Sequence, residues 1–203
     1  MKSIPTLLTL FRILMGPVIG GLILWAAHEL YIDRILAGLI YALALVLFVI
    51  AAVTDWVDGW LARKLDAVTP MGAALDHTAD KVLIACVLVA LAYAALPLEL
   101  TAAAVIILGR DIALGGLREG LSAQGRSLPV APLGKWKAAA EMAGVGAFLA
   151  FQTTALLQLS AGVVIGLYWA ARILIWAAAV LALLSAALYA RAAVSPGGRT
   201  QSS

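Results

Sequence analysis

The sequence predicts an all-α, polytopic membrane protein with six transmembrane helices that follow a short N-terminal amphipathic helix. Of the 203 residues, 64% are hydrophobic and only 12% are charged, whereas soluble domains carry about 25% charged residues. The mean hydropathy is +1.04, and several apolar runs reach the length of about eighteen residues that a helix needs to cross a bilayer. Helices also satisfy their own backbone hydrogen bonds in lipid, so a helical bundle is expected.

The first two predicted helices lie at the N-terminus. Residues 3–12 predict a short amphipathic helix, and residues 13–27 form the first apolar run. An arginine and a proline interrupt this region and no small-residue cleavage site follows, so we do not expect a removable signal peptide. Three glycines in the run permit close packing against a neighbouring helix. They are Gly16, Gly20 and Gly21.

The second, third and fourth crossings follow from three further apolar runs. Residues 35–62 and 71–96 are two such runs, joined by a short polar turn at residues 63–70. Pro97 marks the next turn because proline cannot continue a helix. The fourth run, residues 100–121, becomes polar toward its end.

The C-terminal part predicts a loop, two more crossings and a tail. Residues 122–134 are rich in glycine, serine and proline, which is typical of a loop. Apolar runs at residues 135–157 and 168–190 predict the fifth and sixth crossings, and residues 195–203 predict a disordered polar tail. We therefore expect one transmembrane domain over residues 1–194.

Basic residues indicate the orientation of these crossings. An even number of crossings places both termini on one side, and the loops of the opposite side hold mainly Arg34 and Arg172. By the positive-inside rule, both termini face the cytoplasm. The basic residues of the expected cytoplasmic side are Lys2, Arg12, Arg63, Lys64, Arg118, Arg126, Lys135, Lys137, Arg191 and Arg199.

A net charge of +3 and a pI near 9.2 do not indicate nucleic-acid binding, because the basic residues are spread among membrane segments. Anionic lipid and phosphate-bearing substrates fit this distribution better. The expected partners are therefore a lipid bilayer and no nucleic acid.

Four aspartates form the most informative motif, D-x-x-D-G-x-x-A-R followed after eight residues by G-x-x-x-D-x-x-x-D. An unneutralised charge against apolar membrane helices costs about 2.5 to 3.5 kcal/mol even on lenient scales, so something must offset these carboxylates. Residues three or four apart share a helix face, so each pair projects together. Because a short turn joins the two helices, we expect them to be antiparallel neighbours whose carboxylates converge. The fixed positions are Asp55, Asp58, Gly59, Ala62, Arg63, Gly72, Asp76 and Asp80.

Converging carboxylates favour a pair of divalent cations. Carboxylate oxygens are the ligands expected of Mg²⁺ or Mn²⁺, and two such ions can clamp a phosphoryl group during its transfer. Gly59 and Gly72 leave room for a bulky ligand, and Arg63 offers a bidentate phosphate donor. The reaction class indicated is phosphoryl transfer to an alcohol. The alternative is that the aspartates pair with neighbouring cations such as Lys64 or Lys81 at a solvated helix end.

The motif resembles the signature of the CDP-alcohol phosphatidyltransferase family at all eight positions. This resemblance implies a membrane enzyme that moves a phosphatidyl group from a CDP-linked lipid to an alcohol and releases CMP. It implies that Asp55, Asp58, Asp76 and Asp80 hold two divalent cations, Mg²⁺ or Mn²⁺, and that Asp80 also acts as the base toward the acceptor hydroxyl. It further implies that four residues contact the cytidine diphosphate. They are Gly59, Arg63 and Gly72 of the signature and Thr69, which lies between its two halves.

Other segments are similar to the phosphatidylglycerophosphate synthase branch of this family. They are residues 4–12 (I-P-T-L-L-T-L-F-R), residues 110–119 (R-D-I-A-L-G-G-L-R-E) and residues 134–137 (G-K-W-K). Two departures are His77, where that branch commonly has proline, and Ala138, where it commonly has threonine. The resemblance implies CDP-diacylglycerol and glycerol 3-phosphate as substrates, a homodimer, and a multi-pass protein of the bacterial inner (cytoplasmic) membrane.

The dianionic phosphate of glycerol 3-phosphate needs several cations near the aspartates. Arg110 is the strongest candidate because arginine within an apolar helix is expensive and usually functional. It could instead pair with Asp111 or with an aspartate on a neighbouring helix, and the other candidates could serve as membrane anchors or headgroup contacts. The four candidates are Arg110, Arg118, Lys135 and Lys137.

Two alternatives remain open at this point. The first is the same chemistry with another acceptor, such as phosphatidylglycerol in a cardiolipin synthase or an inositol phosphate. The second is a divalent-cation carrier in which the aspartates form a transport site and no bond is broken.

Overall fold

The computed structural model describes residues 4–64, 70–122 and 133–194. Side chains are described for residues 9–54, 78–117, 119–121 and 133–189. The described residues form six helices and no strand, which confirms the all-α prediction. The helices are α1 (Ile4–Glu29), α2 (Arg34–Lys64), α3 (Pro70–Ala94), α4 (Leu98–Ser122), α5 (Leu133–Leu156) and α6 (Ala161–Val194).

Two helix boundaries differ from the prediction. The expected N-terminal amphipathic helix and the first crossing form one continuous helix, α1, with Pro17 inside it. The buried charge of Arg12 therefore does not mark a break, because this side chain finds a partner in another helix. The last helix begins at Ala161 rather than at residue 168. The apolar residues that follow the turn at Gln158, whose φ is 55°, already belong to α6.

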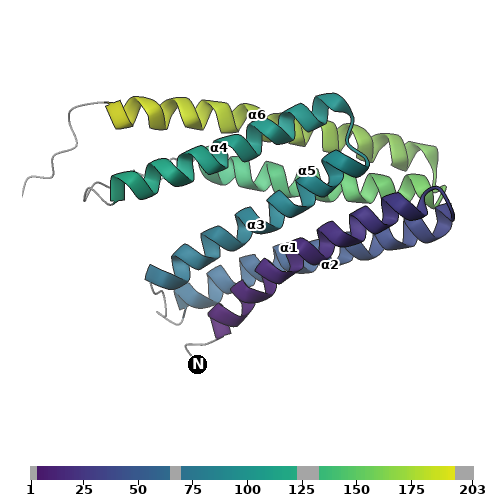
Figure 1. Cartoon of the computed structure of the whole chain (residues 1–203), viewed down its shortest axis with the longest axis horizontal. Helices are drawn as coiled ribbons and strands as arrows, with labels where there is room; N and C mark the ends of the chain where they lie inside the picture. The colour runs from purple at the N-terminus through teal and green to yellow at the C-terminus, as the bar shows by residue number, and fades with distance from the viewer. Residues whose placement is uncertain (1–3, 65–69, 123–132, 195–203) are drawn as a thin grey trace, which may run out of the picture.

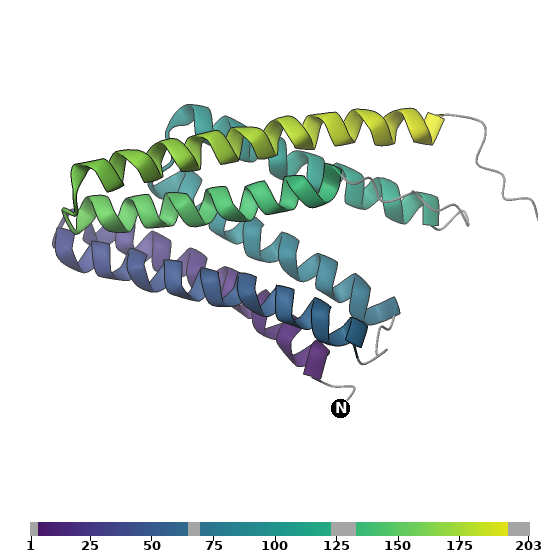
Figure 2. The ribbon, with the colours of Figure 1, turned by 180° about the vertical axis from the view of Figure 1, so that it is seen from behind.

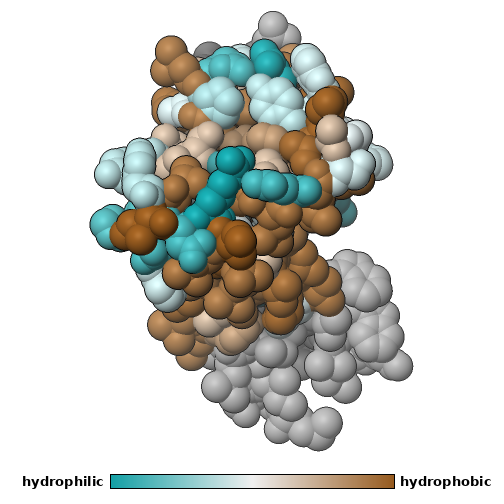
Figure 3. Space-filling view, turned by 90° about the vertical axis from the view of Figure 1, so that its right-hand side faces the viewer, coloured by the Kyte–Doolittle hydropathy of each residue, from teal (hydrophilic) through white to brown (hydrophobic). Residues whose placement is uncertain are grey.

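Four of the helices contain segments long and apolar enough to cross a membrane. These segments are Thr9–Glu29, Arg34–Thr54, Leu98–Leu121 and Ala161–Tyr189, found among the described residues. They support a multi-pass membrane protein, while the count of six crossings stays a prediction. Large apolar side chains exposed along the helices agree with a lipid-facing surface, among them Leu14, Leu43, Val105 and Leu183. Figure 3 shows brown hydrophobic side chains covering much of one face, with teal hydrophilic ones gathered in part of it.

Helix packing places α3, α4 and α5 around a common region. The helix α1 packs against both α2 and α3, α5 packs against α6 and α2, and α4 packs against α6. Direct contacts between α2 and α3 are not found among the described residues, so α1 rather than α3 is the principal neighbour of α2 there. Figures 1 and 2 show α5 running beside α6 in both views. Of the side chains that form the aspartate pairs at the ends of α2 and α3, only Asp80 is described, so the predicted convergence of these ends stays a prediction.

Glycine permits the closest helix contacts. A Cβ added at Gly16 would lie 3.1 Å from the Leu83 Cα and 3.2 Å from the Val82 carbonyl oxygen, so α1 and α3 touch backbone to backbone. A Cβ at Gly144 would lie 3.0 Å from the Ile175 backbone nitrogen, which gives the same close approach of α5 to α6. The first contact agrees with the packing role predicted for Gly16, and it fixes the position of α3 along α1.

The start of α2 is capped by an aspartate. The Asp33 carboxylate accepts hydrogen bonds from the backbone N–H groups of Ile35 (2.8 Å) and Leu36 (3.0 Å). An aspartate in this position satisfies N–H groups that the first turn of a helix leaves without partners. Asp33 therefore fixes the end of the turn that joins α1 to α2.

Candidate active site

The structure describes only part of the predicted site. Asp80 on α3, Arg110 on α4, and Lys135 and Lys137 on α5 have described side chains. The remaining predicted site residues lie outside the described side chains, although most of their helices are described. They are Asp55, Asp58, Gly59, Arg63, Thr69, Gly72, Asp76 and Arg118. The described side chains include only one of the four signature aspartates, Asp80, and no group of metal-binding side chains is found among them.

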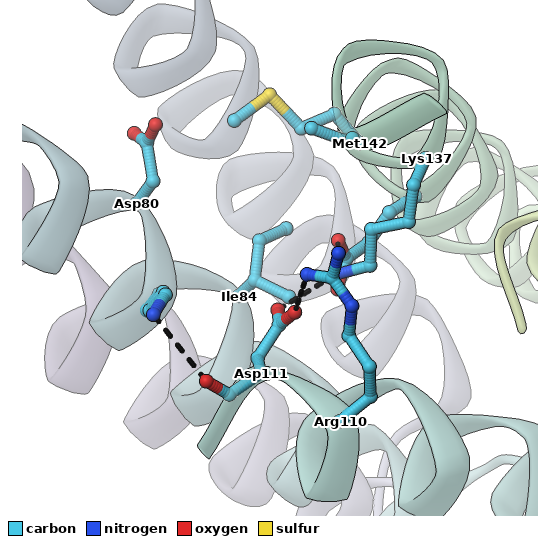
Figure 4. Close-up of a pocket in the computed structure, with 10 residues that line it drawn as sticks. Asp80, Ile84, Arg110, Asp111, Lys137 and Met142 are labelled. Atoms are coloured by element: carbon cyan, nitrogen blue, oxygen red, sulfur yellow. Dashed lines mark hydrogen bonds and ion pairs between the residues drawn. The ribbon is translucent and has the colours of Figure 1, made fainter. Parts of the chain in front are cut away.

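A small polar cavity of about 100 Å³ lies between α3, α4 and α5. Asp80 lies at one side of it, and Arg110, Asp111 and Lys137 meet at the other (Figure 4). Two of the predicted acceptor-binding residues thus share a cavity with the predicted base. The cavity is lined by Asp80, Lys81, Ile84, Arg110, Asp111, Gly134, Lys137, Ala138, Glu141 and Met142.

Asp111 joins the cationic residues of this cavity. Its carboxylate accepts hydrogen bonds from the Arg110 guanidinium at 2.9 Å and from the Lys137 ammonium at 2.6 Å. The Lys81 ammonium donates to the Asp111 backbone carbonyl at 3.3 Å. The pairing of Arg110 with Asp111, which the sequence left open, is therefore present. It does not exclude a ligand, because both cations retain other donors.

Ser185 on α6 fixes the other edge of the Arg110 guanidinium. The Ser185 Oγ accepts hydrogen bonds from Arg110 Nε at 3.1 Å and from the terminal nitrogen Nη2 at 2.7 Å. The same hydroxyl donates to the Ala182 carbonyl at 2.9 Å and is fully buried. These bonds and the Asp111 bond use three of the five guanidinium N–H groups. The other two have no partner among the described residues.

Lys137 and Glu141 form a buried ion pair one turn apart on α5. Lys137 Nζ lies 2.6 Å from Glu141 Oε2, and the two residues are only 3% and 4% exposed. The other carboxylate oxygen, Glu141 Oε1, is buried with no hydrogen-bond partner in the described structure. A buried acceptor without a partner costs free energy, so a donor is expected there when the site is in use.

Arg12 on α1 contacts Asp80 directly. Arg12 Nη1 lies 2.6 Å from Asp80 Oδ1, and the Arg12 side chain is fully buried. Burying an arginine is costly unless it is paired, and this contact provides a pair. The sequence indicated Arg12 only as part of a similar segment, and its position in an apolar run was the signal that could have marked it as functional.

Lys135 differs from Lys137 although both were predicted to bind the acceptor phosphate. Lys135 is exposed and does not line the cavity, whereas Lys137 is buried within it. Residues two apart on a helix point in different directions. The geometry therefore favours Lys137 over Lys135 as an anion ligand.

Comparison with known proteins agrees with this chemistry. The CDP-alcohol phosphatidyltransferase family model matches residues 2–184. A CDP-diacylglycerol–glycerol-3-phosphate 3-phosphatidyltransferase of Pseudomonas fluorescens is 37% identical over 151 residues, which cover 73% of this chain and 72% of the relative. A protein of the same name from Haemophilus influenzae is 34% identical over 176 residues, covering 86% and 88%. A cardiolipin synthase (CMP-forming) of Oryza sativa subsp. japonica is 39% identical over 145 residues, covering 64% and 44%.

The family match spans most of the chain, from α1 into α6, and includes every helix that contributes to the cavity. Both bacterial relatives align over more than two thirds of their own length. The chain belongs to the CDP-alcohol phosphatidyltransferase family.

Proposed function

We propose that this enzyme transfers a phosphatidyl group from CDP-diacylglycerol to glycerol 3-phosphate, giving phosphatidylglycerol phosphate and CMP. The observation that supports it most is the cavity that Asp80 lines together with Arg110 and Lys137 (Figure 4), because it offers a base and an anion site to one acceptor molecule. The names of the bacterial relatives point to the same reaction.

The reaction requires one proton transfer and one exchange of phosphoester bonds. An acceptor hydroxyl oxygen forms a bond to the phosphorus that carries the diacylglycerol, and the bond from that phosphorus to the CMP oxygen breaks. Asp80 takes the hydroxyl proton, and CMP leaves with the electron pair of the broken bond. Arg12 holds one oxygen of Asp80 at 2.6 Å and so restrains the direction in which this carboxylate points.

Enzymes of this family generally depend on divalent cations. The donor chemistry fits, since Asp55, Asp58, Asp76 and Asp80 would supply hard carboxylate oxygens, the ligands that Mg²⁺ and Mn²⁺ prefer. Bound ions would neutralise charge on the pyrophosphate and acidify the hydroxyl. Gly59, Arg63, Thr69 and Gly72 are proposed to contact the cytidine diphosphate.

The phosphate of the acceptor is proposed to bind between Arg110 and Lys137. Two N–H groups of Arg110 and one of Lys137 have no partner among the described residues, so they can donate to a phosphate. Asp111 bonds to both cations and offsets part of their charge before the ligand enters, and the Lys81 ammonium lies beside them. Arg118 and Lys135 are proposed to contribute charge at longer range.

The placement in the cell follows from the resemblance and the charge distribution. We propose a homodimer in a bacterial inner membrane with both termini and the active site on the cytoplasmic side, where soluble glycerol 3-phosphate is available. The concentration of basic residues near the expected cytoplasmic helix ends supports this orientation.

A competition assay tests the acceptor. Purified enzyme receives CDP-diacylglycerol together with equal concentrations of glycerol 3-phosphate, inositol phosphate and phosphatidylglycerol, and lipid products and CMP are measured. We expect phosphatidylglycerol phosphate as the main product, strictly dependent on Mg²⁺ or Mn²⁺, and loss of CMP release in Asp80→Asn. Exclusive production of cardiolipin would contradict the proposal, and metal uptake without CMP release would indicate a carrier.

A further inference from the structure

The unsatisfied oxygen of Glu141 is not explained by the proposed phosphate site. Glu141 is 4% exposed and lines the cavity together with Asp80, Arg110 and Lys137. Its Oε2 is bound to Lys137 at 2.6 Å, while its Oε1 is buried with no partner in the described part of the chain. In its ionised form the Glu141 carboxylate only accepts hydrogen bonds, so a donor completes this site in that form.

The phosphate of the acceptor cannot be that donor. A phosphate dianion carries no proton, so it cannot donate a hydrogen bond to an ionised carboxylate oxygen. The phosphate instead has the donors of Arg110 and Lys137 available, as described above. A neutral hydroxyl elsewhere on the same acceptor can donate to Glu141 Oε1.

Glycerol 3-phosphate carries two hydroxyl groups, one terminal and one in the middle of the chain. The terminal hydroxyl reacts and is directed to Asp80, which leaves the middle hydroxyl free to donate elsewhere. We infer that Glu141 is a specificity-determining residue that accepts a hydrogen bond from the middle hydroxyl of the acceptor, while Arg110 and Lys137 bind its phosphate. This inference rests on the proposed acceptor, and it adds a residue that recognises the middle hydroxyl of that acceptor.

The contact has a defined consequence for substrate choice. A hydrogen bond to a charged group contributes about 1.5–3 kcal/mol, and each 1.4 kcal/mol corresponds to a factor of about ten. An acceptor without the middle hydroxyl leaves Glu141 Oε1 buried and unsatisfied. Its kcat/KM is therefore expected to be about tenfold to a hundredfold below that of glycerol 3-phosphate.

The test compares glycerol 3-phosphate with 3-hydroxypropyl phosphate, which keeps the phosphate and the reacting hydroxyl but lacks the middle one. The measured quantity is the ratio of the two kcat/KM values in the full-length enzyme in detergent or vesicles. We expect a ratio of about ten to a hundred in the wild type, a ratio near one in Glu141→Ala, and an intermediate ratio in Glu141→Gln, which keeps a neutral acceptor oxygen. Met142→Leu, a change of an apolar residue in the same cavity, should keep the wild-type ratio.

The outcomes separate this inference from the proposed function. Equal use of both acceptors by the wild type overturns the role of Glu141 while leaving the proposed reaction intact. A full ratio retained in Glu141→Ala overturns it as well. Failure of the wild type to use glycerol 3-phosphate at all would overturn the proposed function itself. If Glu141→Ala does not fold, Glu141→Gln decides, since an unchanged ratio in that variant speaks against the contact.

Discussion

Substitution of Ser185 by alanine tests whether α6 positions the anion site. The Ser185 hydroxyl accepts two hydrogen bonds from Arg110, at 3.1 and 2.7 Å, and Ser185→Ala removes both. Hydrogen bonds to charged groups contribute about 1.5–3 kcal/mol each, but Asp111 still holds the other end of the guanidinium at 2.9 Å. The free energy lost in positioning Arg110 should therefore correspond to one such hydrogen bond rather than two. At about 1.4 kcal/mol for each factor of ten, this amounts to roughly a tenfold to a hundredfold effect.

The expected effect falls on one substrate. Ser185 is far along the chain from the predicted cytidine-binding residues, and among the described side chains it hydrogen-bonds to Arg110. The KM for glycerol 3-phosphate should rise about tenfold or more, while the KM for CDP-diacylglycerol stays within about twofold. Steady-state kinetics with each substrate varied in turn measures both values.

Two further variants make the result decisive. Ser185→Thr keeps the hydroxyl and should recover most of the acceptor affinity. Leu184→Ala changes a neighbouring side chain that is 52% exposed and should leave both KM values unchanged. Equal increases of both KM values in Ser185→Ala, or no increase in either, would refute the positioning role and indicate that the serine acts only in packing.

Three other predictions follow from the geometry. Lys137→Met should weaken acceptor binding about tenfold or more. It should also lower the unfolding temperature, because buried Glu141 loses its partner and Asp111 loses one of its two. Lys135 is exposed, so Lys135→Met should change acceptor KM by less than about threefold; similar kinetics for both variants would contradict this. Arg12→Met should lower kcat about tenfold or more with little change in either KM, since misdirecting Asp80, the proposed base, acts on the chemical step. A lower unfolding temperature with normal kcat would show a purely structural role. Gly16→Leu should destabilise the protein by about 1–3 kcal/mol, because its Cβ would press on the α3 backbone. The control is Gly21→Leu, since the space around its Cβ is open. Thermal unfolding in detergent should give the wild-type temperature for Gly21→Leu and a lower one for Gly16→Leu.

The fold class was predictable because its cause is local. Apolar runs and turn residues specify helices in lipid whatever their neighbours are, and Pro97 marks the boundary between α3 and α4 in the structure as in the sequence. Boundaries that depend on tertiary contacts were less predictable. The arginine at position 12 suggested a break in the first helix, but its ion pair with Asp80 lets α1 continue through it.

Part of the candidate site was equally predictable, and part was not. Arg110 was predicted from the cost of an arginine in an apolar helix and Lys137 from a similar family segment, and both line the cavity with Asp80. Ser185 could not be predicted, because its bond to Arg110 joins positions 75 residues apart, and a single serine in an apolar helix does not reveal which residue it contacts. Glu141 was not predicted, although it lies one turn after Lys137, a spacing at which helical residues can pair. Nothing in the sequence indicates that its second oxygen lacks a partner among the described residues.

The charges that line the cavity favour an acceptor that carries a strong anion. Three basic side chains and three carboxylates line this cavity. Asp111 bonds to both Arg110 and Lys137, so it competes with an incoming anion for these two cations. A neutral alcohol offers nothing to replace that pairing. A dianionic phosphate can share the cations with Asp111 through the donors still without partners, and charge-assisted bonds of this kind are about twice as strong as neutral ones. The pairing with Asp111 thus stabilises buried Lys137 and partly buried Arg110 when no substrate is bound. A ligand must compete with the Asp111 carboxylate for these cations, which favours a phosphorylated acceptor over an uncharged one.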